Sequence, residues 1–479
     1  MIPECALQPD DPIRLLADYV TNPPIPSKET LDTALLCLSD AIASALMALQ
    51  SSSCRHLIKP LIREMIVPHG CRIVGTDYVV GPMVAAFQLG TMVSWLDYND
   101  AFIGAQTAYP SDCLAPILAT ADYRSRQMAA HKEAPTIGQL LLALVHAYEL
   151  HWLLCSHNSL SSTGLDPLLF AKVASTAVCC RLMGGTYLEI CSAISQAWVD
   201  LCPMYLYHFP PSVGPRKAWS SGDTASRSIL LALMAKKGEP GYPQALSMAN
   251  WGFYDLFRKG EPFFLEKGPQ GSAMANVCFR PRYPGQLYGQ TAIEAAIELH
   301  PHLRHRLGEI DQLLIETHPP ALELVHEGMP LRNSAQRDHS LSYMLAVAIL
   351  RGTVLPSDYE DKPSVDALID QLQGKMRFVE NPQFSRDWLD PNKRSLASSL
   401  SVLWKDGTQL GPYTVEYPLG HPRRRREALP FLREKRLHAL RQRFDNDRVE
   451  TIMHLMAERE QLQRFPVSAF LDLFYVAES

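Results

Sequence analysis

Two aspartates follow a long uncharged stretch of the chain. No charged side chain lies between Asp77 and Asp97, and Asp100 comes three residues after Asp97. This spacing predicts that the two carboxylates share one face at the end of a buried helix. Carboxylates in such a place lose hydration energy unless they are hydrogen-bonded or take part in chemistry. The pattern therefore predicts either proton transfer or a helix cap with a buried salt bridge.

A second group of residues places two cations just before a predicted helix. Arg216 and Lys217 precede the run Ser-Ser-Gly-Asp that ends at Asp223, and we interpret this run as a loop-to-helix junction. Free N–H groups and the dipole at a helix N-terminus bind carboxylates. The junction therefore suits a polycarboxylate ligand, whereas the alternative is a lysine that simply lies in solvent.

A third group contains a histidine whose usual pKa suits proton transfer at neutral pH. Arg337, Asp338, His339 and Tyr343 are spaced so that Asp338 lies near a helix start. His339 and Tyr343 would then lie one turn apart on one face. Imidazole serves as an acid or a base near neutrality. A capped helix with a core tyrosine explains the same residues equally well.

The elements that must position these groups are mainly helical in the first half of the chain. Apolar residues recur at three- and four-residue steps from Leu31 to about Lys259, which is typical of helices with one buried face. We expect an all-helical domain over residues 1–268. Its predicted helices include 31–42, 137–154, 168–183 and 188–199, the last capped by Thr186.

The pattern changes near Glu261. Residues 277–283, 312–317 and 400–404 are rich in β-branched and aromatic types and predict strands, and Asp406-Gly407 predicts a hairpin turn. Helices are expected at 291–299, 339–350 and 365–373. Residues 269–415 therefore predict a smaller α+β domain, and amphipathic helices within residues 416–479 are expected to pack back on the first domain. The fold class is mainly α.

Composition excludes several classes of protein. The 479 residues carry a net charge of -5, which argues against a nucleic-acid-binding chain. The eleven cysteines include no C-x-x-C pair, so we expect a reducing compartment and no zinc site. No basic or Arg-rich leader precedes the first helix, and Gly81 and Pro82 interrupt the apolar run 79–96, which favours a buried helix over a membrane span. These features favour the cytoplasm.

The segment Trp95–Ser125 resembles the signature of the MmgE/PrpD family, which includes 2-methylcitrate dehydratase and cis-aconitate decarboxylase. That signature has a Leu-Asp-(Phe/Tyr)-(Asn/Asp)-Asp-Thr block, a His-Pro-Ser block, and a helix that ends Ala-Asp-(Tyr/Trp)-x-Ser. The resemblance spans about residues 12–465, with its nearest likeness to the dehydratase branch. Further matching blocks are Gly75–Tyr78, Leu182–Gly185, Arg216–Arg227, Trp251–Tyr254, Tyr283-Pro284, Arg337–His339 and Glu416–His421.

The resemblance implies a homodimer in which the helical domain and an α+β lid enclose a cleft. It implies metal-free removal of water from a citrate-like tricarboxylate, with no cofactor, whereas the decarboxylases of the family lose carbon dioxide from the same cleft. The catalytic residues that it implies are Asp97, Tyr109, Lys217 and His339. The residues assigned to substrate binding are Asp100, Ser111, Arg216, Gly222, Tyr288, Arg337 and Tyr343.

Three positions depart from the family pattern. Ala101 stands where a threonine is expected, and Tyr109 and Tyr288 stand where histidines are expected. A phenol with its usual pKa of about 10 is a poor base at neutral pH. Elimination would then use Tyr109 as the acid and Lys217 or His339 as the base. Alternatively, the phenols enlarge or dry the pocket for a more apolar substrate.

These observations predict a dehydratase that acts on an alkylcitrate whose tail is longer than methyl. A role in secondary metabolism, outside propionate detoxification, fits the absent mitochondrial signal. The nearest alternative is a decarboxylase of a cis-aconitate-like acid. A second alternative is a non-catalytic relative that binds a tricarboxylate or a partner enzyme. We expect a small-molecule substrate, no nucleic acid and no membrane.

Overall fold

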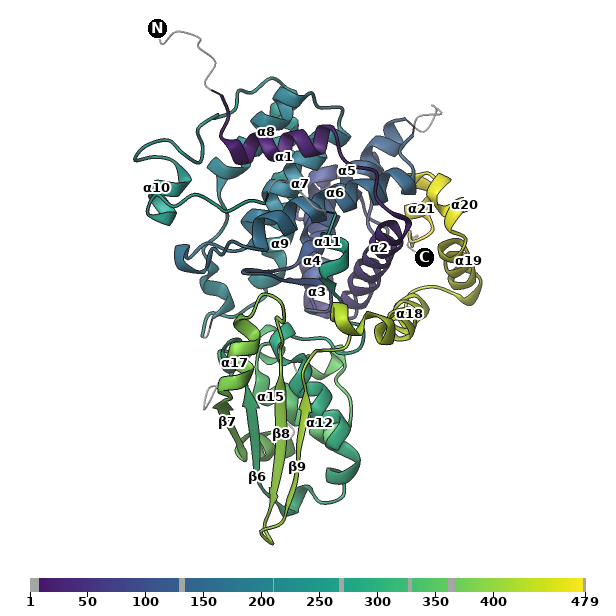
Figure 1. Cartoon of the computed structure of the whole chain (residues 1–479). Helices are drawn as coiled ribbons and strands as arrows, with labels where there is room; N and C mark the ends of the chain where they lie inside the picture. The colour runs from purple at the N-terminus through teal and green to yellow at the C-terminus, as the bar shows by residue number, and fades with distance from the viewer. Residues whose placement is uncertain are drawn as a thin grey trace.

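The computed structural model describes residues 8–128, 134–209, 211–266, 271–325, 330–360 and 367–476. The predicted domain boundary at 268/269 lies outside these residues, as do the first two residues of the helix predicted at 365–373 and both ends of the chain. Helices far outnumber strands, so the chain is mainly α, as predicted. Figure 1 shows a larger helical part above and a smaller part built on a sheet below.

We call the larger part the helical body. Helices α4 and α9 pack closely against each other, and α7 packs on α9. One continuous hydrophobic core fills it. Its helices are α1 (Asp11–Thr21), α2 (Lys28–Ala48), α3 (Ser52–Leu57), α4 (Pro82–Ser94), α5 (Leu114–Gln127), α6 (Ile137–Cys155), α7 (Leu168–Leu182), α8 (Tyr187–Asp200), α9 (Arg216–Lys236), α10 (Phe253–Arg258) and α11 (Ala273–Asn276).

The prediction that this part is all-helical is wrong in detail. The strands β1 (Ile66–Arg72) and β2 (Val79–Val80) pair with each other. A second small sheet has the order β4-β3-β5, with β3 at Ala101–Ile103, β4 at Thr107–Ala108 and β5 at Val277–Cys278. β2, β3, β4 and β5 have only two or three residues, and the longer β1 contains a proline and a glycine, so none gives a clear alternation in the sequence. The strand predicted at 277–283 ends after two residues.

We call residues 283–415 the sheet region. Its sheet has the order β7-β6-β8-β9, in which β6 and β7 are parallel and the other pairs are antiparallel. The strands are β6 (Ile310–Thr317), β7 (Met376–Glu380), β8 (Ser398–Trp404) and β9 (Gln409–Val415), and the predicted turn joins β8 to β9. The helices are α12 (Gln290–Leu303), α13 (Pro319–Leu322), α14 (Ser334–Arg337), α15 (Leu341–Arg351), α16 (Ala367–Gln373) and α17 (Pro382–Leu389). A separate apolar core lies between the sheet and α12 and α15.

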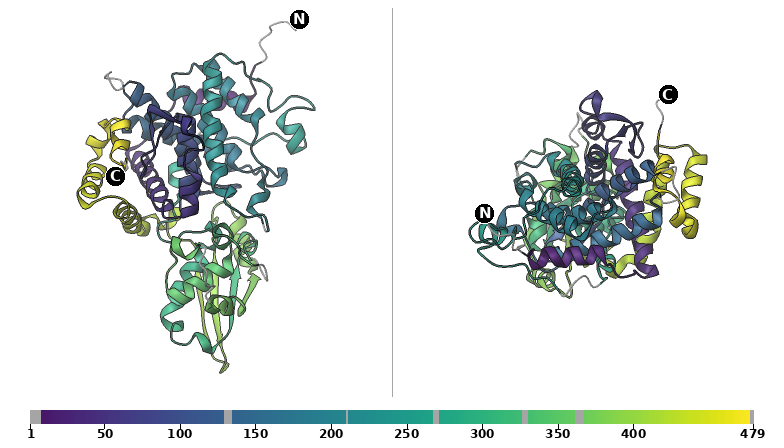
Figure 2. Two further views of the ribbon diagram at one scale, coloured as in Figure 1. Left: turned by 180° about the vertical axis from the view of Figure 1, so that it is seen from behind. Right: turned by 90° about the horizontal axis from the view of Figure 1, so that it is seen from above.

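The last four helices lie beside the helical body, on the right in Figure 1 and on the left in the rear view of Figure 2. They are α18 (Arg425–Arg441), α19 (Asn446–Ala457), α20 (Arg459–Arg464) and α21 (Val467–Asp472). Lys435 of α18 forms a buried ion pair with Asp40 of α2 at 2.8 Å. The apolar side chains of these helices belong to the core of the helical body.

Among the described residues, two helices are long and apolar enough to cross a membrane, namely α2 and α6. Most of each is buried inside the helical body, where an apolar surface on every side of a helix is expected. Length and composition therefore do not distinguish these helices from ordinary core helices.

Candidate active site

Asp97 lies in a tight turn after α4. The helix ends at Ser94, and Asp97 has the left-handed backbone angle φ of 47°, which aspartate tolerates better than most residues. This turn sends Asp97 and Asp100 to different places, so the prediction that they share one helical face is wrong. Strained backbone of this kind costs about 1–3 kcal/mol and persists where surrounding contacts over-determine it.

Arg280 supplies those contacts. Its Nε donates to the carbonyl oxygen of Asn99 at 2.7 Å, and its Nη2 donates to Asn99 Oδ1 at 2.8 Å. Nη1 lies 3.4 Å from Asp97 Oδ1 and donates to the carbonyl of Gly285 at 3.1 Å. Arg280 is almost fully buried. It therefore holds the Asp97 turn from behind and joins it to the start of the sheet region.

Lys217 reaches the same carboxylate from the first turn of α9. It forms a short ion pair with Asp97 Oδ2, and its Nζ lies 3.1 Å from Asp338 Oδ2. Because α9 begins at Arg216, the Ser-Ser-Gly-Asp run lies inside the helix rather than at its junction with a loop. The first helical turn, and not that run, brings the lysine to the site.

Gly222 has a different role from the predicted one. A Cβ at this position would lie 2.2 Å from the carbonyl oxygen of Phe87 in α4. A Cβ on Gly90 of α4 would lie 2.9 Å from the Cα of Gly222. The glycine therefore permits the close contact of α4 with α9, which sets the distance between Asp97 and Lys217, and it does not line the cavity described below.

His339 and Asp338 come from the sheet region. His339 Nδ1 lies 2.7 Å from Asp338 Oδ1 and 3.7 Å from Asp97 Oδ2. A carboxylate at Nδ1 orients the ring and leaves Nε2 free for a proton-transfer role. The structure places both residues before α15, which begins at Leu341 after the N-cap Ser340. His339 and Tyr343 therefore do not share a helix face, contrary to the prediction.

Neighbouring charges determine the ionisation states of Asp97 and Lys217. Burial alone would raise the pKa of Asp97, but Lys217, His339 and Arg280 outweigh burial and lower it. Burial alone would lower the pKa of Lys217, but Asp338 and Asp97 outweigh burial and raise it. At neutral pH the pair is therefore a carboxylate and an ammonium, so Lys217 is a poor base.

Asp97, Asp338 and His339 have the spacing of a metal-ligand group, since one ligand atom from each lies within 4.8 Å of the others. However, the Lys217 ammonium already contacts both carboxylates, and Nδ1 of His339 is directed at Asp338. A metal ion would have to displace that ammonium, so the described residues fit a lysine-centred cluster better than a metal centre.

A cavity of about 570 Å³ opens over this cluster. Asp97, Lys217 and His339 line one end of it. The remaining wall is largely apolar and comes from the segment before α7, the short helix at Tyr205–His208 and the region of α13. Its apolar side chains are Leu165, Pro167, Leu168, Met204, Leu206, Phe209, Pro320 and Leu324. The shape and lining of such a cavity suit a ligand that is polar at one end and apolar at the other.

The two tyrosines that replace the expected histidines both line this cavity. Burial, with Asp97 next, raises the pKa of Tyr109, and its ring faces the Arg280 guanidinium at 5.1 Å. Burial raises the pKa of Tyr288 to about 12. Both groups therefore remain phenols at neutral pH, and they are better suited to donate hydrogen bonds than to transfer protons.

Besides Gly222, five predicted binding residues are not among the described residues that line the cavity. Asp100 accepts hydrogen bonds from the Ser111 backbone N–H at 3.0 Å and from Tyr148 at 2.9 Å, and Ser111 Oγ accepts one from Asn99. This network shapes the Asp97 turn. Arg216, Arg337 and Tyr343 lie elsewhere: Arg216 stacks on Trp219, Arg337 donates to the carbonyl of Tyr359, and Tyr343 donates to that of Asp358.

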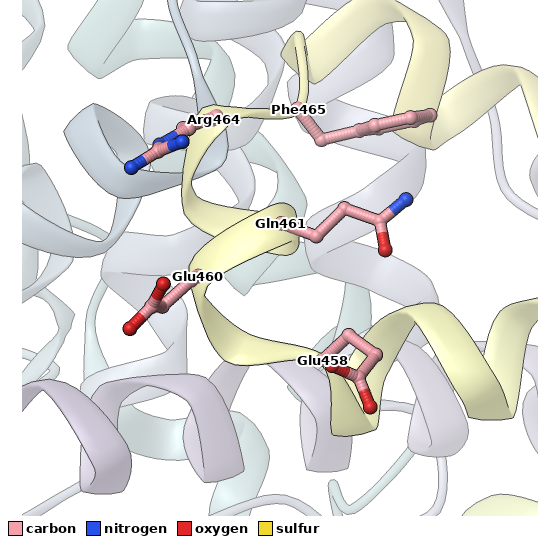
Figure 3. Close-up of a pocket in the computed structure, with 5 residues that line it drawn as sticks. All are labelled: Glu458, Glu460, Gln461, Arg464 and Phe465. Carbon is pink, nitrogen blue, oxygen red and sulfur yellow. The ribbon is translucent and has the colours of Figure 1, made fainter.

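A second hollow of similar size, about 510 Å³, lies between α19 and α20. Figure 3 shows that its side chains project in different directions and do not converge on a common point. They are Glu458, Glu460, Gln461, Arg464 and Phe465. Chemistry that needs an acid and a base around one substrate therefore has a place in the first cavity and not in this hollow.

Sequence reasoning missed several residues of the site. Arg280 lies in a segment interpreted as a strand, and only the structure shows that this arginine is buried. Asp338 was assigned only a position near a helix start. Asp166 and His208 line the cavity from segments about forty residues apart, and nothing in the sequence links them.

Comparison with known proteins identifies the relatives of this chain. Residues 14–266 match the MmgE/PrpD N-terminal domain, and residues 283–459 match the MmgE/PrpD C-terminal domain. The chain is 41% identical to a 2-methylcitrate dehydratase of Cupriavidus necator, with 98% of each chain covered. It is 40% identical to that of Escherichia coli, with 96% of each covered. It is also 35% identical to the 2-methylcitrate dehydratase-like protein oryR of Aspergillus oryzae, with 97% of this chain and 95% of that protein covered.

Proposed function

Because the chain belongs to the MmgE/PrpD family, we propose that it is a hydro-lyase that removes water from a citrate-like tricarboxylate. The observation that carries the proposal is the cavity whose polar end joins Asp97, Lys217 and His339. Elimination next to a carboxylate needs a base for the carbon-bound proton, an acid for the departing hydroxyl and positive charge near the carboxylate.

The cluster provides two of these three. The Lys217 ammonium lies at the cavity wall, where it can bind a substrate carboxylate and stabilise the charge that develops as the proton leaves. His339, oriented by Asp338, is the candidate base through Nε2. Asp97 holds the ammonium in place and keeps it charged.

The substrate that we propose is an alkylcitrate whose tail is longer than methyl. Support comes from the wall opposite the cluster, where Leu165, Leu168 and Leu324 are buried and Met204 and Phe209 are exposed near the opening. A methyl group would leave most of this apolar surface in contact with water. Each methylene of a longer tail that becomes buried against this surface contributes about 0.8 kcal/mol to the free energy of binding, which is roughly a fourfold gain in affinity.

We also propose how the parts of the chain act together. Residues 269–415 form a lid domain over a helical domain made by residues 1–268, and residues 416–479 return to the helical domain. The supporting observations are the two separate apolar cores and the contribution of residues from both parts to one cavity. We further propose a metal-independent homodimer of the cytoplasm that serves secondary metabolism.

The test is incubation of the purified protein with 2-methylcitrate and a series of longer alkylcitrates. We expect alkene absorbance to rise with every member and kcat/KM to increase with tail length. Lys217→Met should slow this rise by about 10²–10³-fold. No elimination with any member of the series would contradict the proposal, and release of carbon dioxide without loss of water would favour decarboxylation.

A further inference from the structure

A second imidazole lies at the wall of the same cavity. His208 is at the end of the short helix Tyr205–His208, and its Nε2 lies 3.2 Å from Asp166 Oδ2. The Tyr207 hydroxyl donates to the same oxygen at 2.6 Å, and Asp166 Oδ1 accepts from the backbone N–H of Leu168 at 2.8 Å. Tyr207 and the Leu168 N–H therefore fix the Asp166 carboxylate, and this carboxylate in turn fixes the His208 ring.

His208 stands next to His339 although the two come from different parts of the chain. Their ring centroids are 6.3 Å apart, and both rings line the cavity. His208 belongs to the helical body, where Tyr205 packs against its ring at 4.3 Å, whereas His339 belongs to the sheet region. Each imidazole has its own carboxylate, Asp166 for one and Asp338 for the other. One substrate can therefore contact both rings through adjacent carbon atoms.

Four other titratable groups at the cavity lack the pairing of an imidazole with a carboxylate that His208 has. Burial lowers the pKa of His151 to about 3, so that its imidazole is neutral, and no described carboxylate is paired with it. The raised pKa of Tyr109 keeps its proton bound. Lys217 is held as an ammonium by two carboxylates. Burial raises the pKa of Asp112 to about 7, but its Oδ1 accepts hydrogen bonds from Ser221 and Ser94.

We infer that His208, held by Asp166 and Tyr207, is the catalytic acid that protonates the departing hydroxyl. The inference rests on the proposed dehydratase function. His339 Nε2 takes the carbon-bound proton, the electron pair of that C–H bond forms the alkene, and the C–O bond breaks. The hydroxyl takes a proton from the protonated His208 and leaves as water. His339 then loses its proton and His208 regains one through solvent, so charge and atoms balance.

The same arrangement explains how elimination proceeds although Tyr109 and Tyr288 stand where histidines were expected. The acid is supplied from the segment between α8 and α9 instead. The same segment carries His208 and three apolar side chains of the cavity wall proposed to contact the alkyl tail, namely Met204, Leu206 and Phe209. One short segment therefore supplies both the side chains that select the substrate and the acid that protonates it.

The experiment compares two leaving groups in the full-length protein. One substrate is an alkylcitrate, and the other is its analogue with fluorine in place of the departing hydroxyl. Fluoride needs no proton to leave, because its conjugate acid is far stronger than water. His208→Gln keeps an amide that can donate to Asp166. The matched control is His157→Gln, since His157 also pairs with a carboxylate, Glu266, at 3.0 Å but lies outside the cavity.

We expect His208→Gln to lower kcat/KM for the hydroxyl substrate by about 10²–10⁴-fold and for the fluoro analogue by less than about tenfold. Asp166→Asn should show the same selectivity with a smaller loss, and His157→Gln should match the wild type. Equal losses on both substrates, or no loss on either, would overturn the role of His208. The same selective loss in Asp112→Asn but not in His208→Gln would also overturn it. If the wild type eliminates water from no alkylcitrate, the proposed function fails and the inference fails with it.

Discussion

The two ends of the cavity differ in how they are built. The cluster end joins Asp97, Lys217, Arg280 and Asp338, which lie up to 241 residues apart in the chain and are buried with their charges paired. The other wall comes largely from residues 161–168 and 204–209. Apart from Tyr205 and the Asp166–His208 pair its side chains are mainly apolar, and part of it is open to solvent.

This difference indicates that the charged cluster and the apolar wall have separate roles. Each charge in the cluster depends on the others, because removing one partner of a buried ion pair leaves an uncompensated charge at a cost of about 3–5 kcal/mol. Substitutions there should damage both folding and chemistry. A side chain of the apolar wall has no such partner, so a change alters only the fit of the tail. We expect the cluster to govern the reaction and the wall to govern the substrate.

The largest expected effect is that of His339→Gln. Removal of the candidate base should lower kcat by about 10²–10⁴-fold. Unlike His208→Gln, it should do so for the hydroxyl substrate and for the fluoro analogue alike, because both lose a carbon-bound proton. Steady-state kinetics with both substrates tests this. A loss confined to the hydroxyl substrate would assign His339 to the acid step instead.

Lys217→Met should follow, with a kcat loss of about 10²–10³-fold. Because Asp97 and Asp338 then lack their cation, we also expect a loss of about 3–5 kcal/mol in the free energy of unfolding, measured by urea denaturation. Lys236→Met is the matched control, since Lys236 is on the same helix and pairs with Glu189 at the surface. It should cost no more than about 1 kcal/mol. Equal effects of the two substitutions would contradict the special role of the cluster.

Leu168→Ser should have a smaller and selective effect. Loss of its buried apolar contact should reduce kcat/KM by about tenfold for a long alkyl tail, and the loss should shrink as the tail shortens. Kinetics across the alkylcitrate series measures this trend. Leu188→Ser, at an exposed leucine outside the cavity, is the control. A loss that is the same for every tail length would place the tail elsewhere.

An effect of a different kind, on stability and not on the reaction, is expected in the pH dependence. Burial raises the pKa of Asp112 to about 7, whereas the unfolded chain has about 3.9. Between these values the folded state keeps a proton that the unfolded state loses. Stability therefore falls as pH rises from about 4 to 7, by at most about 1.4 kcal/mol per pH unit.

Asp112→Asn should remove this contribution. Urea denaturation of wild type and variant at pH 5 and pH 7 should show the wild type losing more stability than the variant over that interval. Parallel pH profiles would indicate that the carboxylate is already ionised in the folded protein at pH 5.

Long helices were predictable from the sequence, and short elements were not. The predicted helix at 137–154 corresponds to α6, the strand at 312–317 to β6, and Thr186 caps α8 with its side chain accepting from the Glu189 N–H. These elements have many periodic residues or a local hydrogen-bond signature. The prediction failed at 97–100 and at 338–343, where one or two residues of irregular backbone decide the direction of a side chain.

The sequence by itself determined the family and the mainly helical fold, and it identified Asp97, Lys217 and His339 as candidate site residues. These features depend on the order of residue types along the chain. Only the tertiary structure decided which groups meet. It brought Arg280 behind Asp97, used Gly222 for helix packing, directed Asp100 away from the cavity and placed His208 beside His339. The physical reason is that charge, burial and hydrogen bonding act over a few ångströms in space, while the chain separates these partners by tens to hundreds of residues.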